Sequence, residues 1–314
     1  TGEASRIGLL IRNAEAIQTL REVNCAILDK TGTITRGEPS VTEWDLPEEA
    51  RPYVYALESS SGHPLAQAII NVISKAEPAD KPDEITEIAG EGVTGIWKDT
   101  KWFAGRPQLN SKKYDKERTV VEIKKNGTVV GYFAITDLIR EDSASAVKEM
   151  KSLGIEPIMA TGDRMGAALR IAQEAGIDNV RWEVRPENKL AIVQNLQSKG
   201  KKVLMAGDGI NDAAALKGAH VGVAMGGGMD LAVDSADIVI LSGGISKIVK
   251  AVRISDKTWN IIRQNLFGAF IYNIIAIPLA MSGLLHPIAA ETAMAASSIT
   301  VILNSLRIAG SADK

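Results

Sequence analysis

The chain has 314 residues, of which 45% are hydrophobic and 24% charged, so we expect more than one well-cored domain. Its formal net charge is −2, and no long basic run is present, which argues against nucleic acid as a partner. The single cysteine, Cys25, excludes an internal disulfide and is expected to be a small buried hydrophobic residue.

The N-terminal part of the sequence has no signal-peptide pattern and begins with Thr1, and we expect the chain to be a piece of a longer protein. Residues 6–23 have the pattern of an amphipathic helix. The apolar run that follows, residues 23–28, predicts a short buried parallel strand that leads directly to Asp29.

Residues 38–130 do not show the alternation of buried strands and helices that would be expected to follow such a strand in a parallel sheet. They predict one helix over residues 56–76 and then short strands, with a β-hairpin that turns at Asn126-Gly127. We interpret this segment as an α+β domain inserted after the first strand.

After Asp137, short apolar strands alternate with amphipathic helices. This alternation predicts an α/β domain with a doubly wound parallel sheet. The expected helices are residues 143–154, 165–176, 186–200 and 210–219, and the expected strands are residues 155–163, 201–209, 221–225 and 237–241.

Three carboxylates stand directly after predicted strands: Asp29, Asp163 and Asp208. In open α/β sheets, ligands bind outside the carboxyl ends of the strands. We therefore expect these three side chains to meet at one crevice.

The C-terminal third is almost free of charge, since residues 264–304 contain one formally charged residue, Glu291. Residues 266–285 and 288–308 are each long enough to cross a hydrocarbon core of about 30 Å. Basic residues at both outer ends, among them Arg263 and Arg307, predict a hairpin with cytoplasmic ends. The alternative is a pair of buried helices in a soluble core.

Asp29 can be a nucleophile, a metal ligand or a helix cap. A carboxylate can attack phosphorus to give an aspartyl-phosphate, provided that positive charge neutralises the phosphoryl oxygens. Lys189 can supply that charge, and Thr161 and Gly162 can donate hydrogen bonds near a helix start. Asp208 together with Asp29 can hold Mg²⁺, which prefers a few carboxylates and substrate oxygens.

Taken together, these motifs resemble the catalytic half of a heavy-metal-transporting, type IB P-type ATPase. The resemblance rests on "DKTGTIT", "TGD", "GDGINDAAAL", the His63-Pro64 pair and "GEGVTG". It implies a haloacid-dehalogenase-like Rossmannoid phosphorylation domain with an inserted nucleotide-binding domain, followed by a two-helix transmembrane hairpin. The implied parts are a stalk helix (1–22), the phosphorylation domain (23–37 and 131–256), the nucleotide-binding domain (38–130), two transmembrane helices (257–309) and a tail (310–314).

The resemblance also assigns residues. Asp29 is implied to be the phosphorylated residue, and Mg²⁺ and ATP are the implied cofactor and substrate. The implied catalytic residues are Asp29, Lys30, Thr31, Thr33, Thr161, Gly162, Asp163 and Lys189. The Mg²⁺ ligands are Asp29, Thr31 and Asp208, with Asn211 and Asp212 nearby. The ATP-binding residues are Glu58, His63, Gly90, Gly92 and Gly95.

The last two helices resemble those of the copper(I) class, whose ion site is matched by Tyr272, Asn273, Met294 and Ser298. Thioether sulfur suits a soft monovalent ion. The implied protein is a multi-pass pump of the plasma membrane with cytoplasmic catalytic domains and lipid around its helices. Its actuator and earlier membrane helices are absent from this sequence, and the chain alone is expected not to transport. The "TGE" at residues 1–3 is interpreted as unrelated to the actuator motif.

Thr31 separates this reading from a plain phosphatase. In haloacid-dehalogenase-type phosphatases the residue two after the nucleophile is usually a second Asp that acts as acid and base. A hydroxyl there predicts slow discharge of an aspartyl-phosphate. The alternatives that stay open are a soluble phosphatase of this type, a pump for zinc, cadmium or cobalt, and a regulatory piece that binds nucleotide without reacting.

Overall fold

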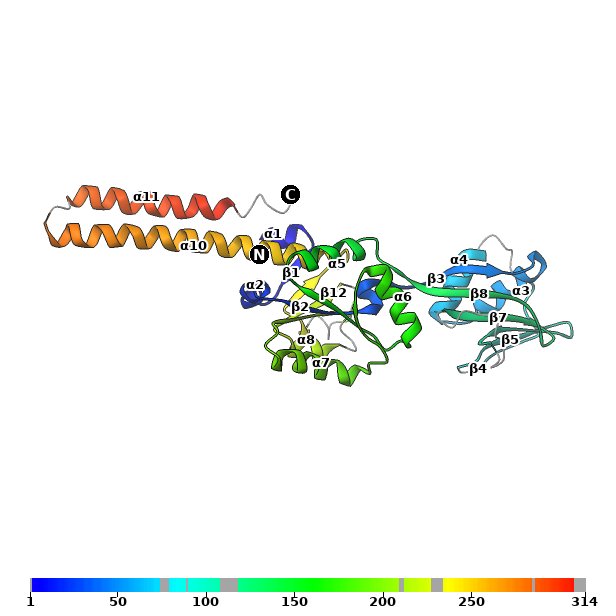
Figure 1. Cartoon of the computed structure of the whole chain (residues 1–314). Coiled ribbons are helices and arrows are strands. Elements are labelled where there is room, and N and C mark those ends of the chain that lie inside the picture. Colours follow the sequence, from blue (N-terminus) through cyan, green and yellow to red (C-terminus); the bar gives the residue numbers. More distant parts are fainter. Residues whose placement is uncertain are drawn as a thin grey trace. The chain divides into compact units, whose positions relative to one another are not determined.

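The computed structural model describes residues 2–73, 79–88, 90–107, 118–208, 212–226, 234–283 and 286–307, and leaves out the side chains of five further residues (Gly2, Glu3, Tyr272, Pro287 and Ala289). The chain separates into two compact units, which are described one at a time (Figure 1). The first unit comprises Thr1–Thr33, Glu141–Gly162 and Gly176–Lys314. The second comprises Ile34–Arg140 and Asp163–Ala175.

The first unit contains a seven-stranded sheet in the order β1-β13-β12-β11-β2-β9-β10. All neighbouring strands are parallel except β1, which runs antiparallel to β13. The bounds are β1 Leu9–Ile11, β2 Cys25–Asp29, β9 Glu156–Ala160, β10 Asn179–Arg181, β11 Val203–Gly207, β12 Val221–Met225 and β13 Ile238–Ile240.

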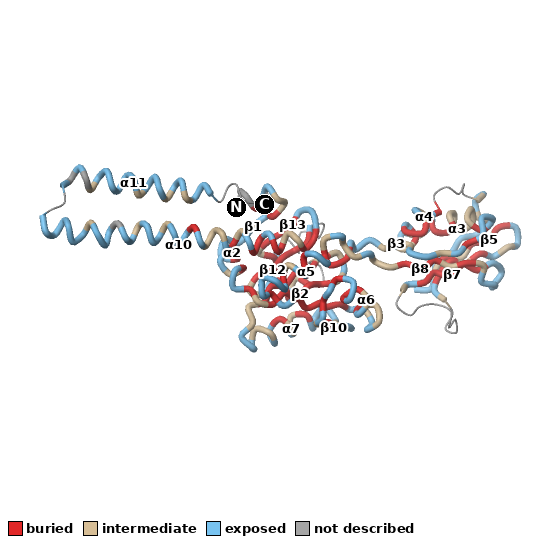
Figure 2. The backbone as a smooth tube through the Cα atoms, turned by 45° about the horizontal axis from the view of Figure 1, so that its top comes forward, coloured by how far each residue is buried: buried red, intermediate tan, exposed pale blue. Residues whose placement is uncertain are grey.

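Helices enclose this sheet, so β2, β11 and β12 are buried along their whole length (Figure 2). Near-continuous apolar strands are the expected signature of a parallel sheet that is covered on both faces. The helices of this unit are α1 Gly2–Arg6, α2 Ala14–Leu20, α5 Ser143–Ser152, α7 Pro186–Ser198, α8 Ala213–Gly218, α10 Ser246–Met281 and α11 Pro287–Leu306. The predicted doubly wound α/β arrangement is confirmed, and Cys25 is fully buried.

The single helix expected over residues 6–23 is wrong. Gly8 has a φ of +78°, a left-handed conformation that ends α1 after Arg6. Leu9 is then buried as part of β1, which pairs with β13 at the edge of the sheet. Tertiary pairing at the sheet edge has overridden the local helical pattern.

The second unit contains a six-stranded antiparallel sheet in the order β3-β8-β7-β6-β5-β4. The bounds are β3 Thr35–Asp45, β4 Glu84–Ile88, β5 Gly92–Trp97, β6 Thr100–Gly105, β7 Thr119–Lys125 and β8 Thr128–Ile139. Asn126 and Gly127 both have positive φ between β7 and β8, which confirms the predicted hairpin turn.

A short 3₁₀ turn, η2 Glu48–Ala50, leads into helices α3 Arg51–Glu58 and α4 Pro64–Ile73, which pack against one face of this sheet. The single helix expected over residues 56–76 is therefore wrong. Five residues, Ser59 to His63, separate α3 from α4, and the first four are of turn-forming type. Pro64 occupies the first position of α4, where proline favours a helix start. Helix α6 Met165–Ala175 also belongs to this unit.

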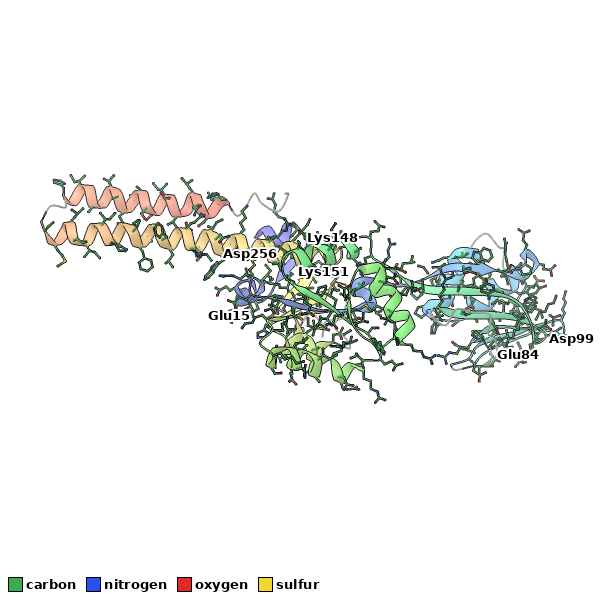
Figure 3. The ribbon with its side chains drawn as sticks, viewed as in Figure 1. Glu15, Glu84, Asp99, Lys148, Lys151 and Asp256 are labelled. Atoms are coloured by element: carbon green, nitrogen blue, oxygen red, sulfur yellow. The ribbon has the colours of Figure 1, made fainter. Side chains whose placement is uncertain are left out.

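Within the first unit, the long helix α10 extends away from the sheet and forms a hairpin with α11 (Figure 1). Asp256, labelled in Figure 3, lies on the part of α10 that packs beside α2, where Oγ of the neighbouring Ser255 donates to the carbonyl of Ile17. Beyond Arg263 the helix carries no charge. Within the described residues, α10 is the one helix whose length and composition suffice to cross a membrane. The second expected span, α11, is not identified as such a helix, and it carries Glu291.

Candidate active site

Asp29 is the last residue of β2, between β11 and β9, and its side chain is buried. The chain then makes a tight turn over Lys30–Ile34. Gly32 has a φ of +69°, which a residue with a Cβ atom adopts only at a cost. A Cβ atom on Gly32 would lie 3.5 Å from Cβ of Asp208, so the turn brings the "DKTGT" segment beside the end of β11.

Lys189, in the first turn of α7, reaches this strand end. Its Nζ donates to Oδ1 of Asp29 at 2.6 Å and to Oδ1 of Asp212 at 2.6 Å. All three side chains are less than a tenth exposed. One buried ammonium group is therefore shared by two buried carboxylates.

The buried carboxylates at this site outnumber the single ammonium group, and burial shifts the pKa values of all three side chains. Burial raises the pKa of Asp29 to about 6, an effect that Lys189 opposes and that Asp212 and Asp208 reinforce. Burial also raises the pKa of Asp212, against the pull of Lys189. Burial lowers the pKa of Lys189, but the two carboxylates outweigh this and leave it above its usual value. Lys189 thus stays protonated while the carboxylates carry excess negative charge.

Close packing sets the position of Asp212. A Cβ atom on Gly207 would lie 2.2 Å from Oδ2 of Asp212, so only glycine fits at the end of β11. Oδ2 of Asp212 is buried and has no hydrogen-bond partner in the described part of the chain, and the same holds for Oγ1 of Thr33. Buried polar atoms of this kind are uncommon and mark places where a ligand or water completes the site.

This arrangement fits a hard divalent cation. Mg²⁺ binds through one or two protein carboxylates and otherwise keeps water and substrate oxygens. Asp208 is half-buried, and its negative charge acts on both Asp29 and Asp212. The described residues contain no cluster of three or more His, Cys, Asp or Glu side chains that would enclose a metal completely.

The other residues expected at this site differ in burial, and not all of them are placed near Asp29. Lys30 is half-buried and Thr31 is exposed. The backbone N–H of Thr161 donates to the carbonyl of Arg181, and a role of this residue toward an anion stays a prediction. Gly162 is exposed, Asp163 falls in the second unit and is not placed against Asp29, and Asn211 lies outside the described residues.

The candidate nucleotide residues lie in the second unit. Glu58, the last residue of α3, is buried, and burial raises its pKa to about 7. His63 precedes α4, and its Nδ1 accepts the backbone N–H of Leu65 at 3.2 Å. That hydrogen bond leaves the ring proton on Nε2. His63 is exposed, so this donor can reach a ligand.

The three glycines of "GEGVTG" do not have the same environment. Gly90 has a φ of +76° in the turn between β4 and β5, where nothing would touch a Cβ atom. Gly92 has a φ of +149°, and a Cβ atom on it would lie 2.2 Å from the carbonyl oxygen of Ala104. Gly95 faces the core, because a Cβ atom there would meet Trp97 at 2.7 Å and Leu57 at 2.9 Å. Packing alone therefore accounts for Gly95.

The candidate ion residues lie in the hairpin. Asn273 on α10 and Met294 on α11 are exposed, and Oγ of Ser298 donates to the carbonyl of Met294 at 3.1 Å. The side chain of Tyr272 is not among those that the structure describes.

Sequence reasoning did not anticipate Asp212 as a direct partner of Lys189, nor Gly207 as the residue that makes room for it. The "GDG" at the end of a strand, followed four residues later by a second Asp, is the signal that was available.

Comparison with known proteins agrees with this geometry. Residues 23–220 match the haloacid dehalogenase-like hydrolase family. The chain is 40% identical to the probable copper-importing P-type ATPase A of Enterococcus hirae, over 98% of this chain and 45% of that protein. It is 38% identical to the copper-exporting P-type ATPase of Staphylococcus saprophyticus, over 98% of this chain and 41% of that protein. The chain thus spans less than half the length of these relatives.

Solved structures give the same picture. A zinc-transporting PIB-type ATPase in an E2.Pi state superposes with a TM-score of 0.86 at 31% identity, over 98% of this chain and 53% of that one. The catalytic domain of the CPx-ATPase CopB-B gives a TM-score of 0.69 at 30% identity, over 80% of this chain and 98% of that one. The chain therefore belongs to the haloacid dehalogenase-like hydrolases, and within them to the catalytic parts of heavy-metal P-type ATPases.

Proposed function

We propose that this chain is the catalytic portion of an ATP-driven heavy-metal pump that forms an aspartyl-phosphate at Asp29. The observation that carries the proposal is the buried Asp29–Lys189–Asp212 cluster at the carboxyl end of β2 and β11. A buried carboxylate at a sheet's carboxyl edge, held by a fixed ammonium group, suits an acceptor for a phosphoryl group.

The reaction assigns one role to each residue of the cluster. An oxygen of Asp29 attacks the γ-phosphorus of ATP, the bond to the bridging oxygen breaks, and ADP leaves with that electron pair. Lys189 balances charge on the phosphoryl oxygens, and Asp212 holds the ammonium group in place. Asp29 and Asp208, with Thr31, would hold Mg²⁺, which supplies positive charge toward the phosphate when bound.

The remaining roles concern the nucleotide and the later step. In the second unit, Glu58, His63, Gly90 and Gly92 bind the nucleotide, and His63 donates from Nε2. Thr31 stands where a phosphatase carries its second carboxylate, so water is not activated by this loop and the phosphoenzyme persists.

The proposed cargo is copper(I), carried across the plasma membrane by a multi-pass protein whose catalytic units are cytoplasmic. Relatives named for copper import and copper export support the metal class. The thioether of Met294, with Tyr272, Asn273 and Ser298, offers a donor set suited to a soft ion. The similarity to a zinc-transporting PIB-type ATPase makes zinc the competing cargo.

Phosphorylation with γ-labelled ATP and Mg²⁺ tests the proposal. We expect an acid-stable, hydroxylamine-sensitive label on the chain that Asp29→Asn abolishes while ATP binding persists. The amide keeps the shape of the carboxylate but is a poor nucleophile. Rapid release of phosphate from small esters would instead identify a phosphatase, and ATP binding without label would identify a regulatory module.

A further inference from the structure

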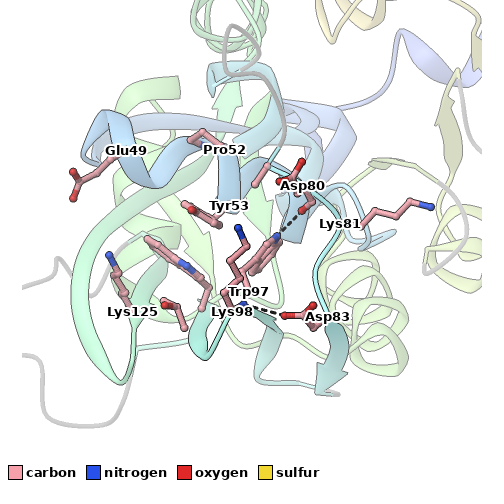
Figure 4. Close-up of a pocket in the computed structure, with 12 residues that line it drawn as sticks. Glu49, Pro52, Tyr53, Asp80, Lys81, Asp83, Trp97, Lys98 and Lys125 are labelled. Carbon is pink, nitrogen blue, oxygen red and sulfur yellow. Dashed lines mark hydrogen bonds between the residues drawn. The ribbon is translucent and has the colours of Figure 1, made fainter.

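Two cavities in the described part of the structure differ in the charges that line them. The cavity of the second unit, about 550 Å³, has the carboxylates of Glu49, Asp80 and Asp83 and as many ammonium groups (Figure 4). Its formal charges balance, so it favours neither anions nor cations. The cavity of the first unit, about 410 Å³, is lined by eight described residues, of which two are basic and none is acidic. Cavities of roughly 300–1,000 Å³ suit small organic ligands, so this one can hold an anion of that size.

The cavity of the first unit lies between helix α7 and the last strand of the seven-stranded sheet, β10 (Figure 2). This strand has three residues and pairs with β9 so that Asn179 lies opposite Ile158. Paired residues, and residues two apart on one strand, point to the same face of a sheet. Ile158 and Arg181 therefore face the same side, where both line the cavity, and the buried Ile158 makes its floor apolar.

One face of α7 forms the other wall. The lining residues from this helix are Asn188, Ala191, Ile192, Asn195 and Leu196, and Lys199 follows directly after its end. Their spacing of three and four residues places them on a single helix face. The seven residues from Asn188 to Asn195 correspond to about 10 Å along the helix, with apolar side chains between the two amides. Lys189 is buried against Asp29 and is not part of this wall.

A basic residue stands at each end of the wall. Arg181 ends β10, and four residues connect it to Pro186 at the start of α7. Lys199 lies at the other end, where α7 has just finished. Two acidic residues of the connection and the first turn, Glu183 and Glu187, do not line the cavity. The lining therefore has the order cation and amide, apolar middle, amide and cation.

The four polar side chains of this lining make no ion pair or side-chain hydrogen bond within the described ranges. The carboxylate of Glu156, two residues before Ile158 on β9, is already engaged. Lys201 donates to one of its oxygens at 3.1 Å and Asn179 to the other at 3.2 Å. Arg181 also lowers the pKa of Glu156, but less than these two partners do. Two positive charges and two amides thus remain for a ligand.

We propose that this cavity binds a linear dicarboxylate with an aliphatic middle. One carboxylate pairs with Arg181 beside the amide of Asn188. The other pairs with Lys199 beside the amide of Asn195, and the chain between them covers Ile158. Charge-assisted hydrogen bonds at both ends and apolar contact in the middle then act together. The inference does not depend on the proposed function, because no residue assigned to phosphoryl transfer lines the cavity.

Octanedioate, octanoate with its single carboxylate, and octanediamine with the opposite charge are the probes. The sample is the intact chain labelled with ¹⁵N in lipid nanodiscs. We expect octanedioate to move the side-chain amide signals of Asn188 and Asn195, assigned with Asn188→Ala and Asn195→Ala. Octanoate should bind about five-fold more weakly, because it pairs with one cation instead of two. Added salt should weaken the binding of octanedioate, since both pairs are partly exposed to solvent.

Arg181→Met and Lys199→Met keep the aliphatic stem and should each weaken octanedioate about five-fold, roughly 1 kcal/mol, to the affinity of octanoate. Lys148→Met is the matched control, an exposed residue of α5 outside the lining (Figure 3), and should bind as the unmodified chain does. Equal affinities for octanedioate and octanoate, or binding of octanediamine, would overturn the proposal. Failure of either amide signal to move at millimolar octanedioate would overturn it as well.

Discussion

Lys189 donates a 2.6 Å hydrogen bond to Asp29, and both side chains are more than nine-tenths buried. Lys189 makes an equal bond to Asp212, so removing this one ammonium group would leave two buried carboxylates without compensation. A buried charge that loses its partner costs far more than an exposed one. The predictions for this site follow from this difference in cost between buried and exposed unpaired charges.

We expect Lys189→Met to lower the free energy of unfolding of the first unit by about 3–5 kcal/mol at neutral pH. The loss should shrink at acidic pH, because burial raises the pKa of both carboxylates and so favours their neutral forms. Chemical denaturation at the two pH values measures this. Lys201→Met, which breaks the exposed Lys201–Glu156 pair, should change stability by less than about 1 kcal/mol. A loss that does not depend on pH would contradict the electrostatic explanation.

Phosphoenzyme formation should depend on the ionisation of Asp29. Burial raises the pKa of Asp29 to about 6, so the nucleophilic form is lost as the pH falls through that value. Initial labelling rates should decline about ten-fold per pH unit below it, and saturating Mg²⁺ should move the decline to lower pH. ATP binding measured at each pH is the control. A rate that stays level down to pH 4.5 would exclude Asp29 as the titrating nucleophile.

Gly207→Ala tests the packing that positions Asp212. The added Cβ atom would lie 2.2 Å from Oδ2 of Asp212, so that carboxylate has to move away from Lys189. We expect the labelling rate to fall at least ten-fold. Gly62→Ala is the control for stability, since nothing lies within 4 Å of a Cβ atom there and no positive φ is recorded. Unchanged labelling would mean that Asp212 is not needed to hold Lys189.

Glu58→Gln should stabilise the second unit at alkaline pH. The pKa of Glu58 is raised from 4.5 to about 7 by burial, so the stability that its neutral form provides below pH 4.5 is lost as the pH rises through 7. Glutamine does not ionise, and the variant should gain about 1–3 kcal/mol at pH 8 and nothing at pH 4.5. Fluorescence-detected unfolding reports mainly on this unit, which holds Trp44, Trp97 and Trp102 of the chain's five tryptophans. Exposed Glu84→Gln should show no such pH-dependent gain.

His63→Asn and His63→Gln separate helix capping from nucleotide binding. Nδ1 of His63 caps α4 through the N–H of Leu65, and asparagine is itself a good N-cap residue. Both variants remove the imidazole ring with its Nε2–H, for which an amide on a different stem is a poor substitute. We expect each to weaken ATP binding about ten-fold, a loss of about 1.4 kcal/mol. The asparagine variant should keep the helix and the fold. Full ATP affinity in either variant would leave capping as the role of His63.

The sequence alone was enough for the parallel sheet and for the place of Asp29 at the carboxyl end of its strand. Apolar runs such as residues 25–28 are buried whichever helices cover them. A polar residue that directly follows such a strand must lie where the carboxyl ends of the parallel strands meet. The turn at Asn126-Gly127 was also fixed locally, because positive φ at both positions favours those two residues.

Other features were decided by the tertiary structure. Leu9–Ile11 became a strand through pairing with β13, about 230 residues further along the chain, and no local pattern reports such a partner. The sharing of Lys189 between Asp29 and Asp212 likewise depends on how α7 and the end of β11 meet, with Gly207 leaving the space. Periodicity specifies which residues are buried, whereas only packing specifies which buried charges touch, because contact distances of a few ångströms depend on every intervening side chain.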